Sequence, residues 1–188
     1  QPHPARREYI PKKNSDKKRP LGIPSANDKL VQEVVRMILE SIHEPTFSEN
    51  SHGFRPRRSC HTALLHLQRT FTGTKWFVEG DIKACFDCFD HHVLIDILRR
   101  RIKDEAFIAL MWKFLKAGYM EQWKFHMNYS GTPQGSGISP ILANIYLNEL
   151  DKHIGEYKKQ FDRGSSSHRK ANPEYERMNG LAKRTKRK

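Results

Sequence analysis

An extended run that ends at a carboxylate constrains the fold of this chain more than any other segment. Residues 76–81 are rich in aromatic and β-branched side chains, which predicts a strand that ends at Asp81 and is followed by a turn. A carboxylate at a strand end is well placed to hold a hard cation such as Mg²⁺, which prefers oxygen ligands. The alternative is that Asp81 only caps the turn. An aromatic residue, Phe86, lies shortly after this carboxylate.

Five further segments carry apolar residues at helical spacing, and each begins with a residue that commonly caps a helix. The helices are predicted to begin at Ser25, Ser59, Asp90, Asp104 and Ser139. Two hairpins are also predicted, one near residues 9–24 and one within residues 119–130. Together with residues 76–81, these elements predict an α+β fold that is mostly helical and has small antiparallel sheets.

The chain is strongly basic, and its charge is concentrated at the two ends. The formal net charge is +13 at pH 7. Residues 1–20 contain seven Lys or Arg against two carboxylates, and residues 163–188 contain nine against two, so the segment between them is nearly neutral. Two basic arms favour a polyanionic partner such as a nucleic acid, because Lys and Arg that contact phosphates release counterions. The alternative is that both arms are solvated tails.

The three cysteines, Cys60, Cys85 and Cys88, show no spacing typical of a disulfide framework. Two cysteines separated by two residues also occur in zinc and redox sites, but no second cysteine pair or clustered histidine pair completes a zinc tetrahedron. We therefore interpret the cysteines as reduced thiols. No apolar run approaches the about 18 residues needed to span a bilayer, so we expect neither a signal peptide nor membrane association.

Two loops carry basic side chains that suit a nucleic acid. The hairpin near residues 9–24 has Lys and Arg at its tip and base, which match the oxygens of a phosphate group. The loop at residues 46–58 contains three arginines and two phenylalanines, and such residues hold phosphates and stack on bases. Each loop is also consistent with an ordinary surface segment, and Phe47 is expected to enter the core.

Four blocks of sequence, in this order and spacing, resemble the N-terminal part of the reverse transcriptases encoded by group II introns, which are also called maturases. The first block is Ile10-Pro11-Lys12 with residues 19–24, and the second is Gly53-Phe54-Arg55-Pro56 with Arg58. The third is Asp81-Ile82-Lys83 with Phe86-Asp87, and the fourth is residues 131–135 with residues 139–144. The resemblance covers roughly residues 7–160. It implies the fingers and partial palm of a right-hand polymerase.

The resemblance also implies a role for particular residues. Asp81 would be the catalytic carboxylate, and Asp81 with the carbonyl of Ile82 would ligate Mg²⁺ in the complete enzyme, which performs two-metal phosphoryl transfer. Phe86 would exclude a 2′-hydroxyl by its bulk. The implied nucleotide-binding residues are Lys12, Arg19, Phe86, Gln134 and Gly135. The basic arms and the arginine-rich loop add the expected RNA-binding residues, which are Arg6, Arg7, Lys17, Lys18, Arg55, Arg57, Arg58, Arg169, Lys170, Lys183 and Arg184.

The sequence departs from the family in two respects. The second palm motif of the family contains an Asp-Asp pair that supplies the remaining metal ligands, and no Asp-Asp pair occurs in this sequence. The thumb helices are also missing. We therefore expect a fragment that binds intron RNA and does not polymerise by itself. Its expected parts are fingers at residues 1–75, fingers with partial palm at residues 76–162, and a basic, disordered tail or insertion at residues 163–188.

The expected partners are group II intron RNA, an RNA template with a DNA primer and, in the complete enzyme, a deoxynucleoside triphosphate. An incomplete palm should expose an apolar surface, which favours a homodimer. The expected location is the bacterial cytoplasm, with association to the nucleoid when the protein acts on DNA. An alternative assignment is a fragment of a retron or diversity-generating reverse transcriptase.

Overall fold

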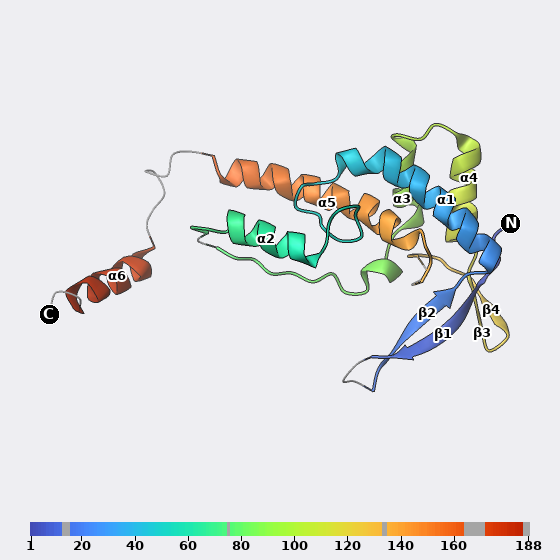
Figure 1. Ribbon diagram of the computed structural model, residues 1–188, viewed down its shortest axis with the longest axis horizontal. Coiled ribbons are helices and arrows are strands. Elements are labelled where there is room, and N and C mark those ends of the chain that lie inside the picture. Colours follow the sequence, from blue (N-terminus) through green and yellow to red (C-terminus); the bar gives the residue numbers. More distant parts are fainter. Residues whose placement is uncertain (13–15, 75, 133–134, 164–171, 186–188) are drawn as a thin grey trace. The chain divides into compact units, whose positions relative to one another are not determined.

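Strands and helices alternate in short groups along the chain of the computed structural model, which describes residues 1–12, 16–74, 76–132, 135–163 and 172–185 (Figure 1). The strands are β1 (Ala5–Pro11), β2 (Lys18–Ile23), β3 (Tyr119–Glu121) and β4 (Lys124–His126). The α-helices are α1 (Ala26–His43), α2 (Cys60–Thr70), α3 (His91–Arg99), α4 (Glu105–Leu115), α5 (Ser139–Phe161) and α6 (Pro173–Thr185). Two short 3-10 helices are η1 (Glu44–Thr46) and η2 (Cys85–Asp87). The predicted α+β class with mostly helical content is confirmed.

Both predicted hairpins are present, but they belong to one sheet with the strand order β2-β1-β3-β4. The pairs β1–β2 and β3–β4 are antiparallel, whereas β1 and β3 run parallel, with Ala5 opposite Tyr119 and Arg6 opposite Met120. The sheet is therefore mixed, which corrects the expectation of purely antiparallel sheets. The reason is that β1 begins at Ala5, earlier than expected, and its first residues offer a second edge to β3. Figure 1 shows the long β1–β2 hairpin extending away from the helices.

The predicted helix starts are confirmed, because polar side chains satisfy the free backbone N–H groups of the first turn. The side chains of Ser25, Ser59, Asp90 and Asp104 accept hydrogen bonds from these groups in α1, α2, α3 and α4. At α2 the bonds are reciprocal, since Thr62 Oγ1 also accepts from the backbone N–H of Ser59 at 2.9 Å. Helix α5 begins at Ser139, with a proline at the tolerated second position.

The hydrophobic core joins α1, α3, α4 and the first turns of α5. Its largest fully buried side chains are Leu39, Leu94, Leu98, Ile108, Met111, Leu115, Leu142 and Ile145. Burying each such side chain stabilises the fold by about 1.5–3 kcal/mol relative to exposure. Phe47 packs in the same cluster, as the sequence predicted. This core holds α1, α3, α4 and the start of α5 together, and it thereby positions the loops that connect the helices.

The predicted strand at residues 76–81 is not formed. Residues 76–82 have no regular structure and no strand partner in the described part of the chain, and Val78 is 92% exposed. A strand requires a neighbour for its backbone hydrogen bonds, and a run of aromatic and β-branched side chains alone does not supply one. Apolar side chains are also exposed on α1 and α2, including Leu30, Val34 and Leu64. These side chains lie in the segment predicted to be fingers, so the apolar surface expected at the incomplete palm stays a prediction.

The chain divides into two compact units, Gln1–Lys152 and His153–Lys188. The second unit contains the end of α5 and the helix α6, and the expectation for the rest of residues 163–188 stays a prediction. Helix α6 forms because Asn172 Oδ1 accepts a hydrogen bond from the backbone N–H of Glu174 at 3.0 Å and Pro173 occupies the first helical position. The predicted boundaries at residues 75 and 162 stay predictions. No helix in the described ranges is long and apolar enough to cross a membrane.

Candidate functional site

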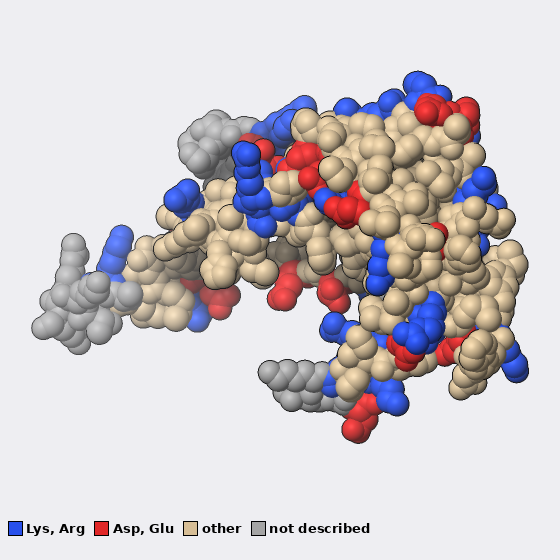
Figure 2. Space-filling view, turned by 45° about the vertical axis from the view of Figure 1, so that its right-hand side comes forward, with Lys and Arg blue, Asp and Glu red and all other residues tan. Residues whose placement is uncertain are grey.

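A cleft of about 670 Å³ lies between the β1–β2 hairpin and the loops of the helical body. Figure 2 shows a hollow beside the hairpin, with Lys and Arg side chains along the hairpin. The cleft is lined by Lys12, Lys18, Arg19, Pro20, Phe54, Ala84, Phe86, Asp87, Gly135, Ser136, Ser139 and Pro140. Its volume is in the range of sites that bind nucleotide-sized ligands. The three cations on one wall make it suitable for a phosphate-bearing ligand.

The cleft brings together four of the five residues that were predicted to bind a nucleotide. Lys12 and Arg19 come from the hairpin, Phe86 from η2 and Gly135 from the loop before α5. The fifth residue, Gln134, lies outside the described residues. They come from three separate segments of the sequence, around residues 12–19, 86 and 135, so only the tertiary structure makes them neighbours.

The loop at Gly135 touches the hairpin so closely that a side chain would not fit. A Cβ atom at Gly135 would lie 2.7 Å from the carbonyl oxygen of Gly22 and 2.7 Å from the side chain of Leu21. The backbone φ of Gly135 is also +102°, a conformation that favours glycine. Because residue 135 is a glycine, the loop packs against the hairpin at the cleft more closely than a residue with a side chain would allow.

A set of short hydrogen bonds ties the floor of the cleft to residues 130–132. The backbone N–H of Thr132 donates to the carbonyl of Phe86 at 2.7 Å, and that of Gly131 donates to the carbonyl of Phe89 at 2.7 Å. The hydroxyl of Ser130 donates to the carbonyl of Asp87 at 2.9 Å. The backbone around Phe86 is therefore held by three bonds from one segment.

No function was predicted for His91 from the sequence. In the structure His91 adds a fourth hydrogen bond to those that hold residues 130–132. Its buried imidazole donates from Nε2 to the carbonyl oxygen of Gly131 at 2.7 Å. No local pattern could have revealed this, because the two partners are 40 positions apart. The edge of the His91 ring also contacts Trp112 at 6.4 Å between ring centroids.

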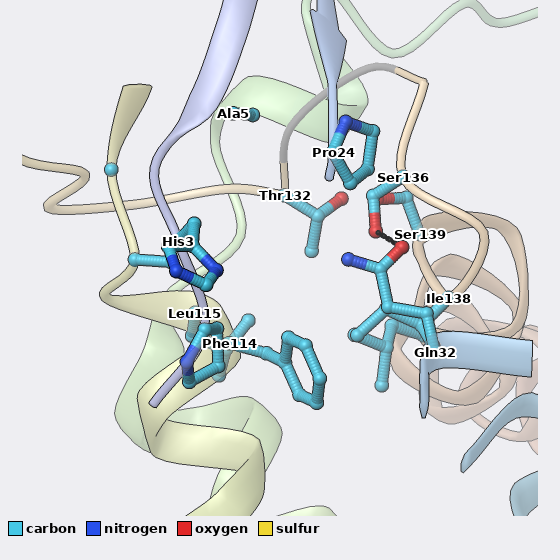
Figure 3. A pocket seen from close by; sticks show the side chains of 14 residues that line it. His3, Ala5, Pro24, Gln32, Phe114, Leu115, Thr132, Ser136, Ile138 and Ser139 are labelled. Atoms are coloured by element: carbon cyan, nitrogen blue, oxygen red, sulfur yellow. Dashed lines mark hydrogen bonds between the residues drawn. The ribbon is translucent and has the colours of Figure 1, made fainter. Parts of the chain in front are cut away.

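Helix α1 holds the other end of the same loop. Gln32 Oε1 accepts hydrogen bonds from the hydroxyl of Ser136 at 3.1 Å and from the backbone N–H of Gly137 at 3.0 Å. Figure 3 shows Gln32 and Ser136 beside a small cavity that Thr132 also faces. This cavity of about 20 Å³ holds one water molecule at most, so it is no substrate site.

Asp81 is exposed and does not line the cleft, whereas Asp87 does. Ile82, whose carbonyl was the second expected metal ligand, is half exposed, and like Asp81 it lies outside regular secondary structure. The described residues contain no group of three His, Cys, Asp or Glu side chains that could hold a metal ion. The residues present therefore do not complete a site for a pair of divalent cations. Asp81 is not held at a strand end, because residues 76–82 pair with no strand in the described part of the chain.

The cysteines are free thiols, in agreement with the sequence interpretation. Burial raises the pKa of the Cys85 thiol, and the nearby Cys88 and Asp81 raise it further. A thiol with a raised pKa stays protonated at neutral pH, whereas a zinc ligand is a thiolate.

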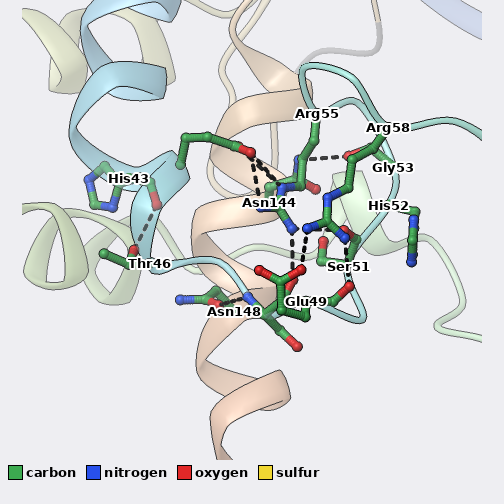
Figure 4. Close-up of polar contacts among 12 residues, drawn as sticks. His43, Thr46, Glu49, Ser51, His52, Gly53, Arg55, Arg58, Asn144 and Asn148 are labelled. Carbon is green, nitrogen blue, oxygen red and sulfur yellow. Dashed lines mark hydrogen bonds and ion pairs between the residues drawn. The ribbon is translucent and has the colours of Figure 1, made fainter. Parts of the chain in front are cut away.

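The side chain of Arg55 is buried and bonds to other parts of the protein, while its expected contact with RNA stays a prediction (Figure 4). Its side chain is only 4% exposed and forms an ion pair with Glu44 at 2.9 Å. It also donates to the carbonyls of Ser48 at 2.7 Å and Ser51 at 2.8 Å. The guanidinium is occupied by protein acceptors, because it closes the loop at residues 46–58 upon itself.

Helix α5 fixes this loop from the other side. Asn144 Nδ2 donates to the carbonyl of Gly53 at 2.8 Å, and Asn148 Oδ1 accepts from the backbone N–H of Ser48 at 3.3 Å. The result is that Phe54, which is 74% exposed and has a φ of 53°, is held at the wall of the cleft. The sequence reasoning assigned no separate role to Phe54.

The other predicted RNA-binding residues are distributed over the surface. Arg6, Lys17, Lys18, Arg57 and Lys183 are exposed, and Arg6 pairs with Glu8 at 3.4 Å. Arg58 donates to the carbonyl of Glu49 at 2.6 Å. The guanidinium of Arg7 lies 3.4 Å from the centre of the Tyr119 ring. Arg169, Lys170 and the side chain of Arg184 lie outside the described residues.

Comparison with known proteins identifies what this chain is similar to. Residues 10–166 match the family described as reverse transcriptase (RNA-dependent DNA polymerase). The chain is 58% identical over 183 residues to the group II intron-encoded protein LtrA of Lactococcus lactis subsp. cremoris. The aligned residues make up 97% of this chain and 30% of that protein.

Two fungal proteins are also similar. An uncharacterized 91 kDa protein in the cob intron of Schizosaccharomyces pombe is 49% identical over 98% of this chain and 23% of its own length. A putative COX1/OXI3 intron 2 protein of Saccharomyces cerevisiae is 42% identical over 97% of this chain and 22% of its own length. The chain spans less than a third of the length of each of these curated relatives.

Proposed function

The chain belongs to the reverse transcriptase family, and on that basis we propose that it is part of a group II intron-encoded RNA-directed DNA polymerase that also acts as a splicing maturase. The observation that carries the proposal is the cleft in which Lys12, Arg19, Phe86 and Gly135 meet. A cleft with cations on one wall and an aromatic ring on the other suits a nucleoside triphosphate.

The nucleotide lies in the cleft with its phosphates toward the hairpin. Lys12 and Arg19 contact the phosphate oxygens, and Gln134 with the backbone of Gly135 orients the nucleotide near its sugar. The ring of Phe86 lies beneath the sugar and leaves no room for a 2′-hydroxyl, so a deoxynucleotide is selected by shape. The hydrogen bonds from Gly131 and Thr132 support this role, because they hold the backbone around Phe86.

Polymerases of this family use a divalent metal, and the cation is Mg²⁺ in this proposal. Asp81 supplies one carboxylate and the carbonyl of Ile82 a second oxygen, but the described residues offer no complete ligand set. The remaining ligands come from outside this chain. The chain alone therefore binds nucleotide and RNA and does not extend a primer, whereas the complete protein copies an RNA template from a DNA primer.

Structured intron RNA is the second ligand of the proposal. The support is the basic charge of residues 1–20 and 163–188, together with the relationship to an intron-encoded protein. Binding through these arms should weaken as salt rises, because each phosphate contact releases counterions. The proposed location is the bacterial cytoplasm, with contact to the nucleoid when the complete protein acts on DNA.

Titration of the chain with a fluorescent deoxynucleoside triphosphate tests the cleft. Arg19→Ala should weaken binding by about ten-fold, because it removes a charge-assisted hydrogen bond to phosphate. Arg6→Ala is the matched control, since Arg6 lies on the same hairpin, is exposed and does not line the cleft. Equal effects of the two substitutions would show that the cleft does not bind the nucleotide.

A primer-extension assay tests the inactivity of the isolated chain. With RNA template, DNA primer and Mg²⁺, the chain should give no more product than a blank without protein. Extension by this chain that disappears in Asp81→Ala would contradict the proposal. The complete protein should extend the primer under the same conditions.

A further inference from the structure

A second concave site lies away from the nucleotide cleft, between the first residues of the chain, the end of α4 and strand β4. It is a groove of about 290 Å³, lined by Pro2, Pro4, Trp112, Lys113, Lys116 and Phe125 together with Gln1 and Ala117. None of these residues lines the cleft that contains Arg19 and Phe86. The groove is therefore a separate site, and the proposed polymerase function does not account for it.

Two aromatic rings and two ammonium groups give this groove its chemistry. Trp112 and Phe125 contribute the rings. Lys113 lies in the last turn of α4, and Lys116 is the first residue after the helix. No carboxylate lines the groove, and neither lysine forms an ion pair with a described carboxylate. The site is thus apolar at its walls and positively charged at its rim.

The ring of Trp112 is held in a fixed orientation. The ring of His92 contacts it edge-on at 4.8 Å between centroids, and His91 contacts it at 6.4 Å. The ammonium of Lys116 lies 4.5 Å from the centre of the indole ring. A preorganised aromatic face of this kind suits a flat ligand, because little side-chain freedom is lost on binding.

We propose that this groove binds one unpaired nucleotide of a single-stranded RNA, with its base against Trp112 and Phe125 and its phosphate at Lys113 and Lys116. A base that stacks on Trp112 displaces the Lys116 ammonium from the ring, and the ammonium then contacts the phosphate. Stacking on an aromatic ring is stronger than an exposed contact between an ammonium and a ring, so the exchange is favourable.

Charge and shape together select this ligand over other occupants. An apolar protein segment would leave the two lysines without acceptors, whereas a phosphate satisfies them. Paired RNA presents its bases stacked inside a helix, and only an unpaired base can insert between two rings. The groove therefore recognises single-stranded or looped RNA without a strong preference for sequence.

Binding of a fluorescent, unstructured RNA octamer to this chain tests the proposal, with the same octamer in a duplex for comparison. Phe125→Ala should weaken binding of the single strand by about ten-fold without changing the salt dependence. Lys113→Ala should reduce the slope of log affinity against log salt by about 0.7, the value for one phosphate contact on a single strand. Phe71→Ala and Lys29→Ala are matched controls, since both residues are exposed and lie outside the groove.

A second measurement does not depend on any change in the groove. The chain has three tryptophans, and Trp76 and Trp123 are 74% and 98% exposed, so both can be replaced by Phe to leave Trp112 as the only indole. Saturable quenching of the Trp112 fluorescence by the octamer is the expected result. Absence of quenching would overturn the proposal, as would equal loss of single-strand and duplex binding in Phe125→Ala. The proposal also fails if Phe125→Ala leaves RNA affinity unchanged and instead dissociates a dimer in sedimentation velocity.

Discussion

The imidazole of His91 donates a hydrogen bond of 2.7 Å to the carbonyl oxygen of Gly131, and this bond links the start of α3 to the loop that forms the floor of the cleft. The side chain of His91 is buried. When the imidazole is removed, the carbonyl of Gly131 keeps only a long contact of 3.4 Å from Asn128 Nδ2. The position of Phe86 therefore depends on a residue that does not touch the cleft.

Replacing this imidazole should loosen the loop. His91→Ala should lower the free energy of unfolding by about 2 kcal/mol, since it leaves a buried carbonyl with a poor partner and creates a small cavity. Urea unfolding followed by circular dichroism measures this loss. His92→Ala is the control, because His92 is exposed and its imidazole does not bond to the loop. Equal losses in the two variants would assign the cost to the contacts with Trp112 instead.

A side chain at Gly131 should displace the backbone of Phe86. The Cβ of Gly131→Ala would lie 2.4 Å from the carbonyl oxygen of Phe86, and the φ of +73° adds strain for any other residue. In the complete polymerase we expect the preference for deoxynucleotides over ribonucleotides to fall by about ten-fold, a change of about 1.4 kcal/mol in relative binding. Gly53→Ala is the control, because nothing lies within 4 Å of the added methyl group. Unchanged selectivity together with normal folding would contradict the proposed gate.

Substitutions of Arg55 and Arg57 should have different effects on stability, although the two residues are only two positions apart. Arg55→Ala should lower the free energy of unfolding by about 3 kcal/mol, because it leaves Glu44 and two loop carbonyls without their donor. Arg57→Ala should leave stability unchanged, since its side chain is exposed. Urea unfolding of both variants makes the comparison. A stable Arg55→Ala chain that loses RNA affinity would support the expected RNA contact of this residue.

Stability should fall between pH 6.5 and pH 4 because of His43. Burial, together with the nearby Arg101 and Lys152, lowers the pKa of its imidazole to about 4, whereas the unfolded chain has a value near 6.5. Below pH 6.5 the unfolded state binds a proton that the folded state does not, which costs up to about 3 kcal/mol by pH 4. At pH 7 and above this contribution is fully present.

Urea unfolding at pH 7.5 and pH 4.5 isolates this effect. The difference in stability between the two pH values should shrink in His43→Leu, since leucine has no proton to bind. His61→Gln is the control because His61 is exposed. If the pH difference is the same in His43→Leu and in the unmodified chain, another group is responsible.

The exposed apolar face of α1 should promote self-association. Leu30, Val34 and Met37 are more than half exposed and are one helical turn apart. Contiguous apolar surface of this kind favours a dimer in solution. Light scattering at micromolar concentration should show a dimer that Val34→Lys disrupts. A clean monomer over the same range would contradict the expected homodimer.

The helices could be predicted because their signals are local. Ser25, Ser59, Asp90 and Asp104 cap the helices they precede, and the apolar spacing after each one needs no distant partner. The four blocks of sequence also identified the family, since motif order is a property of the chain itself. The pairing of β1 with β3 and the state of residues 76–81 could not be predicted in this way, because a strand depends on a neighbour that the local pattern does not specify.

Sequence alone determined which residues could act on a nucleotide, since charge, ring size and the absence of a side chain at Gly135 are properties of the residues themselves. The tertiary structure decided which of them meet: it placed Arg19 beside Phe86, buried Arg55 against Glu44 and joined His91 to Gly131. These contacts span distant parts of the chain, and their formation depends on how the whole core packs. Long-range packing therefore decided the geometry, while local chemistry had already limited the possible roles.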